Sequence, residues 1–434
     1  MKGGPLASDY QIGFGASSHR FRLPVAQPLR LIQPPVVDCR LSPEQVIRRA
    51  LEQPIGCPPL HKLARGARTA AILVPGKDRV AGVAFCLPLI LQELNSAGIP
   101  DERIEVILAT GTHAKHTPQE VAGVLGQQAT SRLRWREHDC GPAGEFNLLG
   151  ATSRGTQVAL AKAVVEADLR ILTGRIIPHY FAGFGGGRKA LLPGVAAFET
   201  ILQNHRLTLA PEGGIHRRMR PCSLEGNPVH LDMVEAARMA GTTFVLNTLL
   251  DWEDRLVHAV AGELEVAHLA GCTEAERLLK VVLPEPLDAV ICSAGGAPYD
   301  CNFTQALKAV LDVQEVVRPG GAILWVASCP EGMKKQFLHW AAIESDEQLK
   351  VAVQAKYDLA GHNSILLRSA LRKARIALWS GLPEEQVRCL GLEPMQSLEQ
   401  GLEWLRRNCP AGACCGFASR ANVIYATAAG GLPA

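Results

Sequence analysis

The chain has 434 residues, of which 47% are hydrophobic and 20% charged, with a formal net charge of +3 at pH 7. This composition is typical of a globular α/β enzyme, and the length allows two or three domains. The small net charge and the lack of a basic block argue against a nucleic-acid partner. No run of about 18 apolar residues and no signal-peptide layout occurs, so we expect a cytoplasmic protein without a membrane span.

Thirteen cysteines are scattered along the chain, and none of them forms a C-x-x-C pair. Most have apolar or small neighbours, which is typical of buried, reduced thiols in a cytosolic protein. The sequence therefore predicts neither a zinc knuckle nor a disulfide framework.

The first predicted elements alternate between helix and strand. Ser42 and Pro43 are suited to open a helix, because serine caps the first turn and proline fits it. The apolar run 69–74 predicts a strand that ends near Arg79, and a helix follows at 87–97. A second strand at 103–109 leads into His113, and Thr117 is suited to start the next helix.

The stretch 174–206 is the centre of the predicted site. It follows an apolar strand at 167–173 and contains His179, four glycines and Lys189, followed by a predicted helix at 195–205 whose last turn carries His205. In open α/β sheets, ligands bind at the carboxyl ends of strands. Because glycines let a backbone approach a ligand closely, this loop is suited to surround an anion.

A linker at 283–286 separates a second α/β unit, which begins with a strand at 287–293. The helix after this strand carries Gln305 and Lys308 one turn apart. Further strands are predicted at 321–327, 376–379 and 422–426, the last of which can return to either domain. We therefore expect two doubly wound α/β domains, 1–282 and 287–434, that face each other across a cleft.

The predicted cleft contains two imidazoles and several groups that bind anions. His113 and His179 titrate near neutral pH and can exchange proton-donating and proton-accepting roles. Arg79 and Lys308 are suited to hold a carboxylate. A paired acid and base around an anion favours a racemase or epimerase. Removing a proton from the α-carbon of a hydroxy acid is difficult, so hydride transfer is the easier route, but the chain has no dinucleotide fingerprint to supply the acceptor.

Several strings in this chain resemble the nickel-pincer lactate racemase family. They are ATGTHAKHT at 109–117, PHYFAGFGGGRKALLPG at 178–194, ETILQNH at 199–205, LEGNPVH at 224–230 and YDCNFTQALKAV at 299–310. The resemblance covers roughly residues 70 to 390 and includes the spacings between His179, Lys189 and His205. It implies a racemase or epimerase that acts on a small 2-hydroxy acid through a 2-keto acid.

The resemblance also implies the cofactor and the roles of individual residues. The cofactor is a nickel-pincer nucleotide, a pyridinium with two thiocarbonyl groups, which implies a dependence on cofactor biosynthesis proteins. The implied tether is Lys189, and the implied nickel ligand is His205, which suits Ni(II) beside soft sulfur donors. The implied catalytic residues are His113 and His179. The remaining implied contacts are Gly185, Gly186, Gly187 and Arg188 for the cofactor and Arg79, Gln305 and Lys308 for the substrate.

The chain departs from the family pattern at two places. The family carries Asp-x-x-Arg before the implied substrate arginine, whereas this chain has Gly76, Lys77, Asp78 and Arg79. Ala114 follows His113 where lactate-type members often carry arginine. Both departures favour a substrate other than lactate.

Two other functions remain alternatives. One is a non-catalytic protein that binds nickel or an anionic metabolite, and the other is a metal-dependent hydrolase or lyase. The hydrolase or lyase is less favoured because no clustered carboxylates accompany the histidines. Of the other histidines, we expect His116 at the surface and His230 in a structural role.

Overall fold

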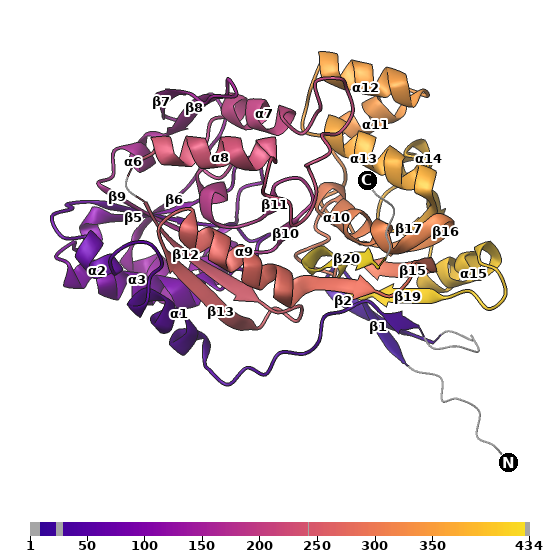
Figure 1. Cartoon of the computed structure of the whole chain (residues 1–434), viewed down its shortest axis with the longest axis horizontal. Coiled ribbons are helices and arrows are strands. Elements are labelled where there is room, and N and C mark those ends of the chain that lie inside the picture. The colour runs from indigo at the N-terminus through magenta and orange to yellow at the C-terminus, as the bar shows by residue number, and fades with distance from the viewer. Residues whose placement is uncertain (1–8, 23–28, 242, 430–434) are drawn as a thin grey trace. The chain divides into compact units, whose positions relative to one another are not determined.

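The computed structural model describes residues 9–22, 29–241 and 243–429. The chain divides into two compact units (Figure 1), which we name by their position in the sequence. The N-terminal unit contains residues 35–208 and 218–278, and the C-terminal unit contains residues 1–34, 209–217 and 279–434. The division near residue 279 lies close to the predicted linker, but the first 34 residues group with the C-terminal unit.

The N-terminal unit is built on a six-stranded sheet in the order β13-β12-β9-β4-β5-β6. All neighbouring strands are parallel except the edge pair of β12 and β13. The strands are β4 (Ala70–Val74), β5 (Ile104–Leu108), β6 (Arg134–Glu137), β9 (Leu169–Arg175), β12 (Thr243–Leu250) and β13 (Leu256–Gly262). Every residue of β4 and β9 is buried, as expected for parallel strands that are covered on both faces.

Five helices of the N-terminal unit share a hydrophobic core with one face of this sheet. They are α1 (Pro43–Glu52), α2 (Leu60–Leu63), α3 (Val83–Ser96), α4 (Pro118–Leu125) and α5 (Gln127–Arg132). Ser42 and Thr117 cap α1 and α4 through capping boxes, in agreement with the sequence. The other helices of this unit are α6 (Lys162–Val165), α7 (Phe198–Arg206), α8 (Pro228–Met239) and α9 (Val266–Leu279).

The C-terminal unit contains a second six-stranded sheet, in the order β18-β17-β16-β15-β19-β3. All its strands are parallel. They are β3 (Arg30–Leu31), β15 (Leu287–Ser293), β16 (Val317–Val326), β17 (Ala374–Trp379), β18 (Glu393–Met395) and β19 (Cys415–Ala418). Two α/β units with parallel sheets confirm the predicted fold class.

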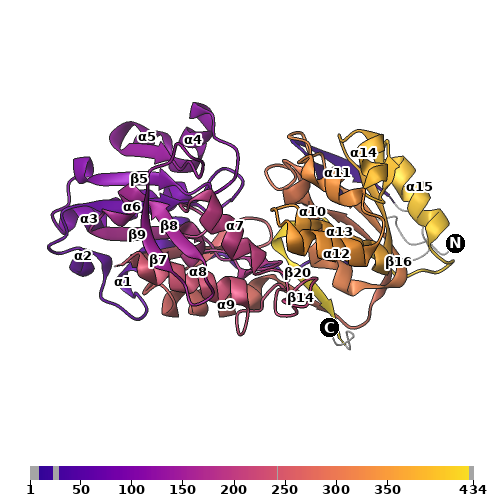
Figure 2. The same ribbon diagram turned by 90° about the horizontal axis from the view of Figure 1, so that it is seen from above.

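A hairpin from the start of the chain covers one face of the C-terminal sheet. Its strands are β1 (Tyr10–Phe14) and β2 (Ser17–Phe21), and Ile12 and Phe21 share a core with Ile291 and Leu324 of the sheet. This explains why the first residues group with the C-terminal unit. The helices of the unit, visible again in Figure 2, are α10 (Phe303–Val313), α11 (Gln336–Ala341), α12 (Asp346–Ala355), α13 (Gly361–Lys373), α14 (Glu384–Cys389) and α15 (Leu398–Asn408).

Among the described residues, four strand pairs lie outside the two large sheets, and one is the hairpin of β1 and β2. The predicted last strand is β20 (Tyr425–Ala428), which pairs in parallel with β14 (Lys280–Leu283) in the C-terminal unit. The other pairs join β7 (Phe146–Ala151) to β8 (Gln157–Ala161) and β10 (Pro178–His179) to β11 (Gly183–Phe184). Short 3-10 turns are η1 (Asp101–Arg103), η2 (Gly187–Ala190), η3 (Gln314–Val316) and η4 (Ala421–Val423).

The two large sheets are wound in the same way. In the N-terminal unit the chain runs outward from β4 through β5 to β6, and then returns with β9 on the other side of β4. In the C-terminal unit it runs outward from β15 through β16 and β17 to β18, and then returns with β19 beside β15. Each unit therefore has a topological switch point, where ligands bind in open α/β sheets.

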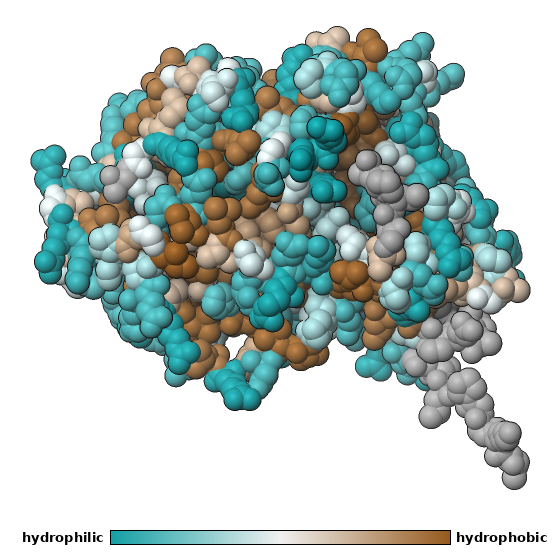
Figure 3. Space-filling view, in the orientation of Figure 1, coloured by the Kyte–Doolittle hydropathy of each residue, from teal (hydrophilic) through white to brown (hydrophobic). Residues whose placement is uncertain are grey.

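Hydrophilic and hydrophobic residues are interspersed over the face that Figure 3 shows. Large hydrophobic side chains that are well exposed include Leu148 and Val351. Among the described residues, no helix is long and apolar enough to cross a membrane.

Candidate active site

The loop that follows β9 at the switch point of the N-terminal unit has a backbone that only glycine permits. We call residues 176–190 the glycine loop. Gly183, Gly186 and Gly187 have φ angles of +73°, +73° and +53°. A Cβ atom at Gly183 would lie 2.4 Å from the carbonyl oxygen of Ser223, and one at Gly187 would lie 2.7 Å from the imidazole of His268. The loop is therefore closely packed against the rest of the unit.

A buried guanidinium anchors the glycine loop from inside. The Arg188 side chain is 1% exposed and donates to the carbonyl oxygens of Ala182 at 2.8 Å, Gly185 at 3.3 Å and Gly186 at 3.4 Å. Desolvation lowers the pKa of Arg188 to about 10. Arg188 makes no carboxylate ion pair with any described residue, and its polar contacts are with loop carbonyls and with one imidazole.

His268 and Asn247 complete this anchor. His268 Nε2 lies 2.8 Å from Arg188 Nη1 and also 2.8 Å from the carbonyl oxygen of Gly185, so this ring contacts both the guanidinium and the loop backbone. Burial, with Arg188 as a second cause, lowers the pKa of His268 well below its ordinary value, which keeps the ring neutral. Asn247 accepts from the amide of Gly187 at 3.0 Å and donates to the carbonyl of Gly174 at 3.2 Å.

Three predicted site residues surround one aromatic ring. Phe181 is 4% exposed, and its ring centroid lies 4.5 Å from that of His179 and 5.0 Å from that of His205. The Lys189 amine lies over the same ring, 5.2 Å from its centroid. Arg188 precedes Lys189 in the same 3-10 turn and points inward. Its hydrogen bonds therefore fix the backbone of the turn that carries Lys189. The structure therefore brings together His179, Lys189 and His205, as the sequence predicts.

His205 lies in the last turn of α7, where the sequence places it. The preceding residue, Asn204, is fully buried and donates to Asp232 of α8 at 2.8 Å. The same carboxylate of Asp232 accepts from Thr152 at 2.5 Å and Thr156 at 2.8 Å. This buried network holds α7 against α8 and so fixes the helix turn that carries His205.

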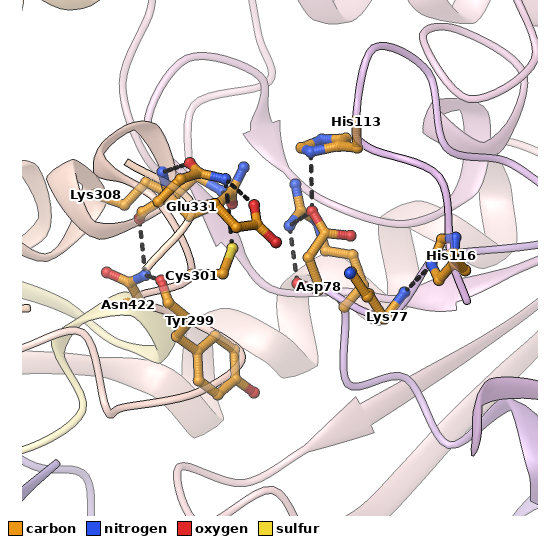
Figure 4. Close-up of polar contacts among 12 residues, drawn as sticks. Lys77, Asp78, His113, His116, Tyr299, Cys301, Lys308, Glu331 and Asn422 are labelled. Carbon is orange, nitrogen blue, oxygen red and sulfur yellow. Dashed lines mark hydrogen bonds and ion pairs between the residues drawn. The ribbon is translucent and has the colours of Figure 1, made fainter. Parts of the chain in front are cut away.

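A second group forms at the ends of β4 and β5 in the same unit. His113 Nδ1 lies 3.0 Å from the carboxylate of Asp78, as Figure 4 shows. Arg79 Nη1 donates to the same oxygen at 2.9 Å. The Asp78 side chain is 11% exposed, whereas those of His113 and Arg79 are 37% and 36% exposed. Asp78 therefore contacts two predicted site residues. Its position next to Arg79 in the sequence did not predict its contact with His113.

The prediction that His116 lies at the surface is wrong, because its side chain is 2% exposed. His116 Nδ1 forms a short contact with Glu137, and Nε2 accepts from the amide of Lys77 at 2.7 Å. The ring also fills the space beside Gly76, where an added Cβ would lie 2.9 Å from it. His116 therefore links the loop after β4 to the loop after β5. His230, for which the sequence predicts a structural role, is buried, and burial lowers its pKa to about 3.

The C-terminal unit positions Gln305 and Lys308 on the first turns of α10. Asn302 caps this helix by accepting from the amide of Gln305 at 3.1 Å, and Lys308 donates to Gln305 Oε1 at 2.5 Å. Asn422 follows β19 and donates to the carbonyls of Tyr299 at 3.1 Å and Gln305 at 2.9 Å. Both predicted residues thus belong to the switch point of this unit.

The sequence did not predict the parts played by Phe181, Asn247 and His268, or the contact of Asp78 with His113. Phe181 lies inside the string that carries the resemblance, so its aromatic side chain between His179 and Lys189 was an available signal. His268 had no local signal, because it contacts Arg188 across 80 residues of sequence.

The donor set fits the cofactor that the resemblance implies. The described residues contain no group of three or more His, Cys, Asp or Glu side chains arranged to hold a metal ion. Within the Phe181 cluster they offer the amine of Lys189 and the imidazole of His205 on one ring. An imidazole close to an amine would suit a metal whose other ligands come from a soft, bound group.

Comparisons with known proteins identify relatives of this chain. Residues 14–215 match the family model described as the lactate racemase N-terminal domain, and residues 282–407 match the lactate racemase C-terminal domain. A lactate racemase of Thermoanaerobacterium thermosaccharolyticum is 33% identical over 344 residues, which are 79% of each chain. A lactate racemase of Lactiplantibacillus plantarum is 33% identical over 68% of each chain.

Solved structures show the same relationship. The lactate racemase apoprotein from T. thermosaccharolyticum superposes with a TM-score of 0.85 at 28% identity, covering 96% of this chain and all of the other. A Thermotoga maritima protein shares the fold, with a TM-score of 0.66 at 15% identity over 91% of this chain and all of the other. Together, the fold and these relatives define an α/β enzyme of the isomerase class. The chain belongs to the lactate racemase family.

Proposed function

We propose that this enzyme racemises or epimerises a small 2-hydroxy acid through a 2-keto acid, with a nickel-pincer nucleotide attached to Lys189. The observation that carries the proposal is the Phe181 cluster, in which a tethering amine, a metal-binding imidazole and a second imidazole contact one buried ring. The curated relatives are named lactate racemases, which supports the reaction type.

The chain's own residues would bind the substrate and move its protons. When bound, the cofactor supplies the hydride acceptor that the chain itself lacks. His113 and His179 would take a proton from the substrate hydroxyl and return one to the oxygen. Arg79 and Lys308, with Gln305, would hold the carboxylate and orient the reacting carbon. The backbone would approach the cofactor at Gly185, Gly186 and Gly187. Arg188 would hold this loop in place through its hydrogen bonds to the loop carbonyls.

The departures at Gly76 and Ala114 support a 2-hydroxy acid other than lactate. At position 76 the imidazole of His116 occupies the space that a longer side chain would need. The carboxylate on this loop is instead supplied by Asp78, which engages both His113 and Arg79. The polar surroundings of the substrate arginine therefore differ from the family pattern.

The first test is the intact mass of the protein made together with cofactor biosynthesis proteins, followed by peptide mapping and nickel analysis. We expect an adduct on Lys189 and bound nickel, and turnover of at least one chiral 2-hydroxy acid in a screen. Lys189→Arg should lose the adduct, and Lys162→Arg, at an exposed position of α6, should keep it. An unmodified Lys189 under these conditions would contradict the proposal.

A second test separates catalysis from binding. His113→Ala and His179→Ala should each lower turnover by about 10²- to 10⁴-fold, the usual contribution of a general acid or base, and should keep the Lys189 adduct. If both variants bind the cofactor but turn over at the wild-type rate, the paired acid and base role is wrong. If the wild-type protein carries nickel but converts no substrate, a binding protein becomes the better description. Hydrolysis or elimination in the same screen would favour the metal-dependent hydrolase or lyase.

A further inference from the structure

The contact of His113 with Asp78 determines which ring nitrogen carries the proton. An ionised carboxylate can only accept hydrogen bonds, so His113 Nδ1, 3.0 Å from Asp78, must donate. A neutral imidazole carries one proton, and the lone pair of His113 is therefore on Nε2. Because Arg79 donates to the same carboxylate oxygen at 2.9 Å, Asp78 is held in its ionised form by a permanent cation.

The contacts of His179 impose the opposite arrangement. Its Nδ1 accepts from the backbone amides of Phe181 at 3.4 Å and Ala182 at 3.3 Å. Amide N–H groups can only donate, so His179 Nδ1 must carry the lone pair. In the neutral ring the proton is then on Nε2. Both amides belong to the glycine loop, whose backbone is fixed by Arg188 through the carbonyls of Ala182, Gly185 and Gly186.

We propose that Asp78 and the two loop amides hold His113 and His179 in opposite tautomers, which makes Asp78 a positioning residue for His113. His113 presents a proton acceptor at Nε2, and His179 presents an N–H at Nε2. The arrangement is a property of the N-terminal unit and is set before any substrate arrives.

The chemical consequence rests on the proposed function. His113 can accept a hydroxyl proton at Nε2 without changing partners, because Nδ1–H stays on Asp78. His179 can donate a hydrogen bond from Nε2 at once, but it can accept a proton there only after its own proton has left. Protonation of His179 at Nδ1 would also displace two amide donors. The two histidines are therefore unequal in the resting enzyme, although a symmetrical reaction uses both.

The test is the ¹⁵N NMR spectrum of the cofactor-free protein with labelled histidines, recorded near pH 8.5, about two units above the ordinary imidazole pKa of ~6.5. His113→Gln and His179→Gln assign the two rings among the thirteen histidines. We expect His113 to have its protonated nitrogen at Nδ1 and His179 to have it at Nε2. The same tautomer in both rings of the wild-type protein would overturn the proposal, and this result needs no variant at Asp78.

Asp78→Asn sharpens the assignment, because an amide can donate as well as accept. We expect His113 to shift towards the Nε2–H tautomer while the signals of His179 stay unchanged. Asp78→Leu, which cannot accept, should give the larger shift. The matched control is Asp139→Asn, which removes one negative charge near Lys115 and should leave both rings unchanged. An unchanged His113 tautomer in both Asp78 variants would show that Asp78 does not position the ring.

These measurements do not depend on turnover. Opposite tautomers in a protein that converts no 2-hydroxy acid would leave the inference standing and reject the proposed function. Equal tautomers in an active racemase would do the reverse.

Discussion

The two units share one winding but place different chemistry at their switch points. In the N-terminal unit, the loops after β4, β5 and β9 carry Asp78, His113, His179 and Lys189, which can exchange protons or form a covalent bond. In the C-terminal unit, the loop after β15 leads to α10, which carries Gln305 and Lys308, and the segment after β19 carries Asn422, which donates to the carbonyl of Gln305. The same winding thus carries imidazoles, a carboxylate and an amine at the switch point of one unit, and an amide and an amine at that of the other.

The units also fix their loops with buried charges of opposite sign. In the N-terminal unit the guanidinium of Arg188 donates to loop carbonyls. In the C-terminal unit the fully buried carboxylate of Asp300 accepts from the amides of Gly15 at 2.8 Å and Ser328 at 2.9 Å. Each charge satisfies backbone groups that would otherwise be buried without partners. The comparison shows that either sign can organise such a loop, provided that the backbone presents the complementary groups.

We expect the largest loss of stability when a side chain is added to the glycine loop. Gly183→Ala would force a Cβ against the carbonyl of Ser223 at a φ of +73°, so we expect the free energy of unfolding to fall by about 4 kcal/mol. Gly155→Ala has a φ of +86° and nothing within 4 Å, and should cost only about 1 kcal/mol. Urea unfolding of both variants measures the difference, and equal losses would contradict the close packing of the loop.

We expect the second largest loss of stability when the guanidinium of Arg188, which anchors the glycine loop, is removed. Arg188→Met keeps much of the side-chain volume but leaves the carbonyls of Ala182, Gly185 and Gly186 without this donor, so we expect a loss of about 3 kcal/mol. The variant should also lower the yield of the Lys189 adduct, because the turn that carries the lysine loses its anchor. Arg65→Met, at an exposed position, is the control and should change neither quantity. A fully stable Arg188→Met protein would show that packing alone holds the loop.

The anionic anchor of the C-terminal unit should give a somewhat smaller effect. Asp300→Ala leaves two buried amides without an acceptor, and we expect unfolding to become easier by about 2 kcal/mol. Both amides donate to one carboxylate oxygen, so Asp300→Asn can keep both contacts and should cost about 1 kcal/mol. Denaturant unfolding of these two variants separates the effect of losing the acceptor from the effect of losing its charge. If asparagine is as harmful as alanine, the charge rather than the acceptor is what matters.

The smallest expected effect is the change in the free energy of unfolding per pH unit. Burial lowers the pKa of His230 and His362 to about 3 and that of His268 well below its ordinary value. Below the unfolded pKa of about 6.5, the unfolded chain binds protons that the folded protein does not, so stability falls as pH drops from about 6.5 towards 3. Each such histidine contributes up to about 1.4 kcal/mol per pH unit.

Removal of one of these histidines checks the size of this contribution. His230→Gln should make the unfolding free energy less steep in pH between 6 and 5, by an amount close to one proton. His258→Gln, at an exposed position, should leave the slope unchanged. An unaltered slope in His230→Gln would mean that this ring becomes protonated in the folded protein.

Local patterns predicted much of the fold. The strand at 287–293 has the predicted bounds because an apolar run rich in β-propensity is a local signal, and Ser42 and Thr117 cap helices for the same reason. The resemblance identified His179, Lys189 and His205, which the structure places around Phe181. The contact between Asp78 and His113 joins the ends of two strands, and that between Arg188 and His268 joins a loop to a helix. The spacing of residues along the chain predicts neither of these two contacts, because both contacts depend on how the strands are paired.

The hairpin at the start of the chain has a consequence for biosynthesis. β3 pairs with β19 almost a full chain length away, and Ile12 packs on strands that are synthesised last. During translation, residues 35–278 can complete their own sheet while the hairpin still lacks the surface that it will cover. The hairpin therefore reaches its native partners only after residues 279–434 have been synthesised, and residues 279–434 expressed alone would expose the apolar face that the hairpin normally covers.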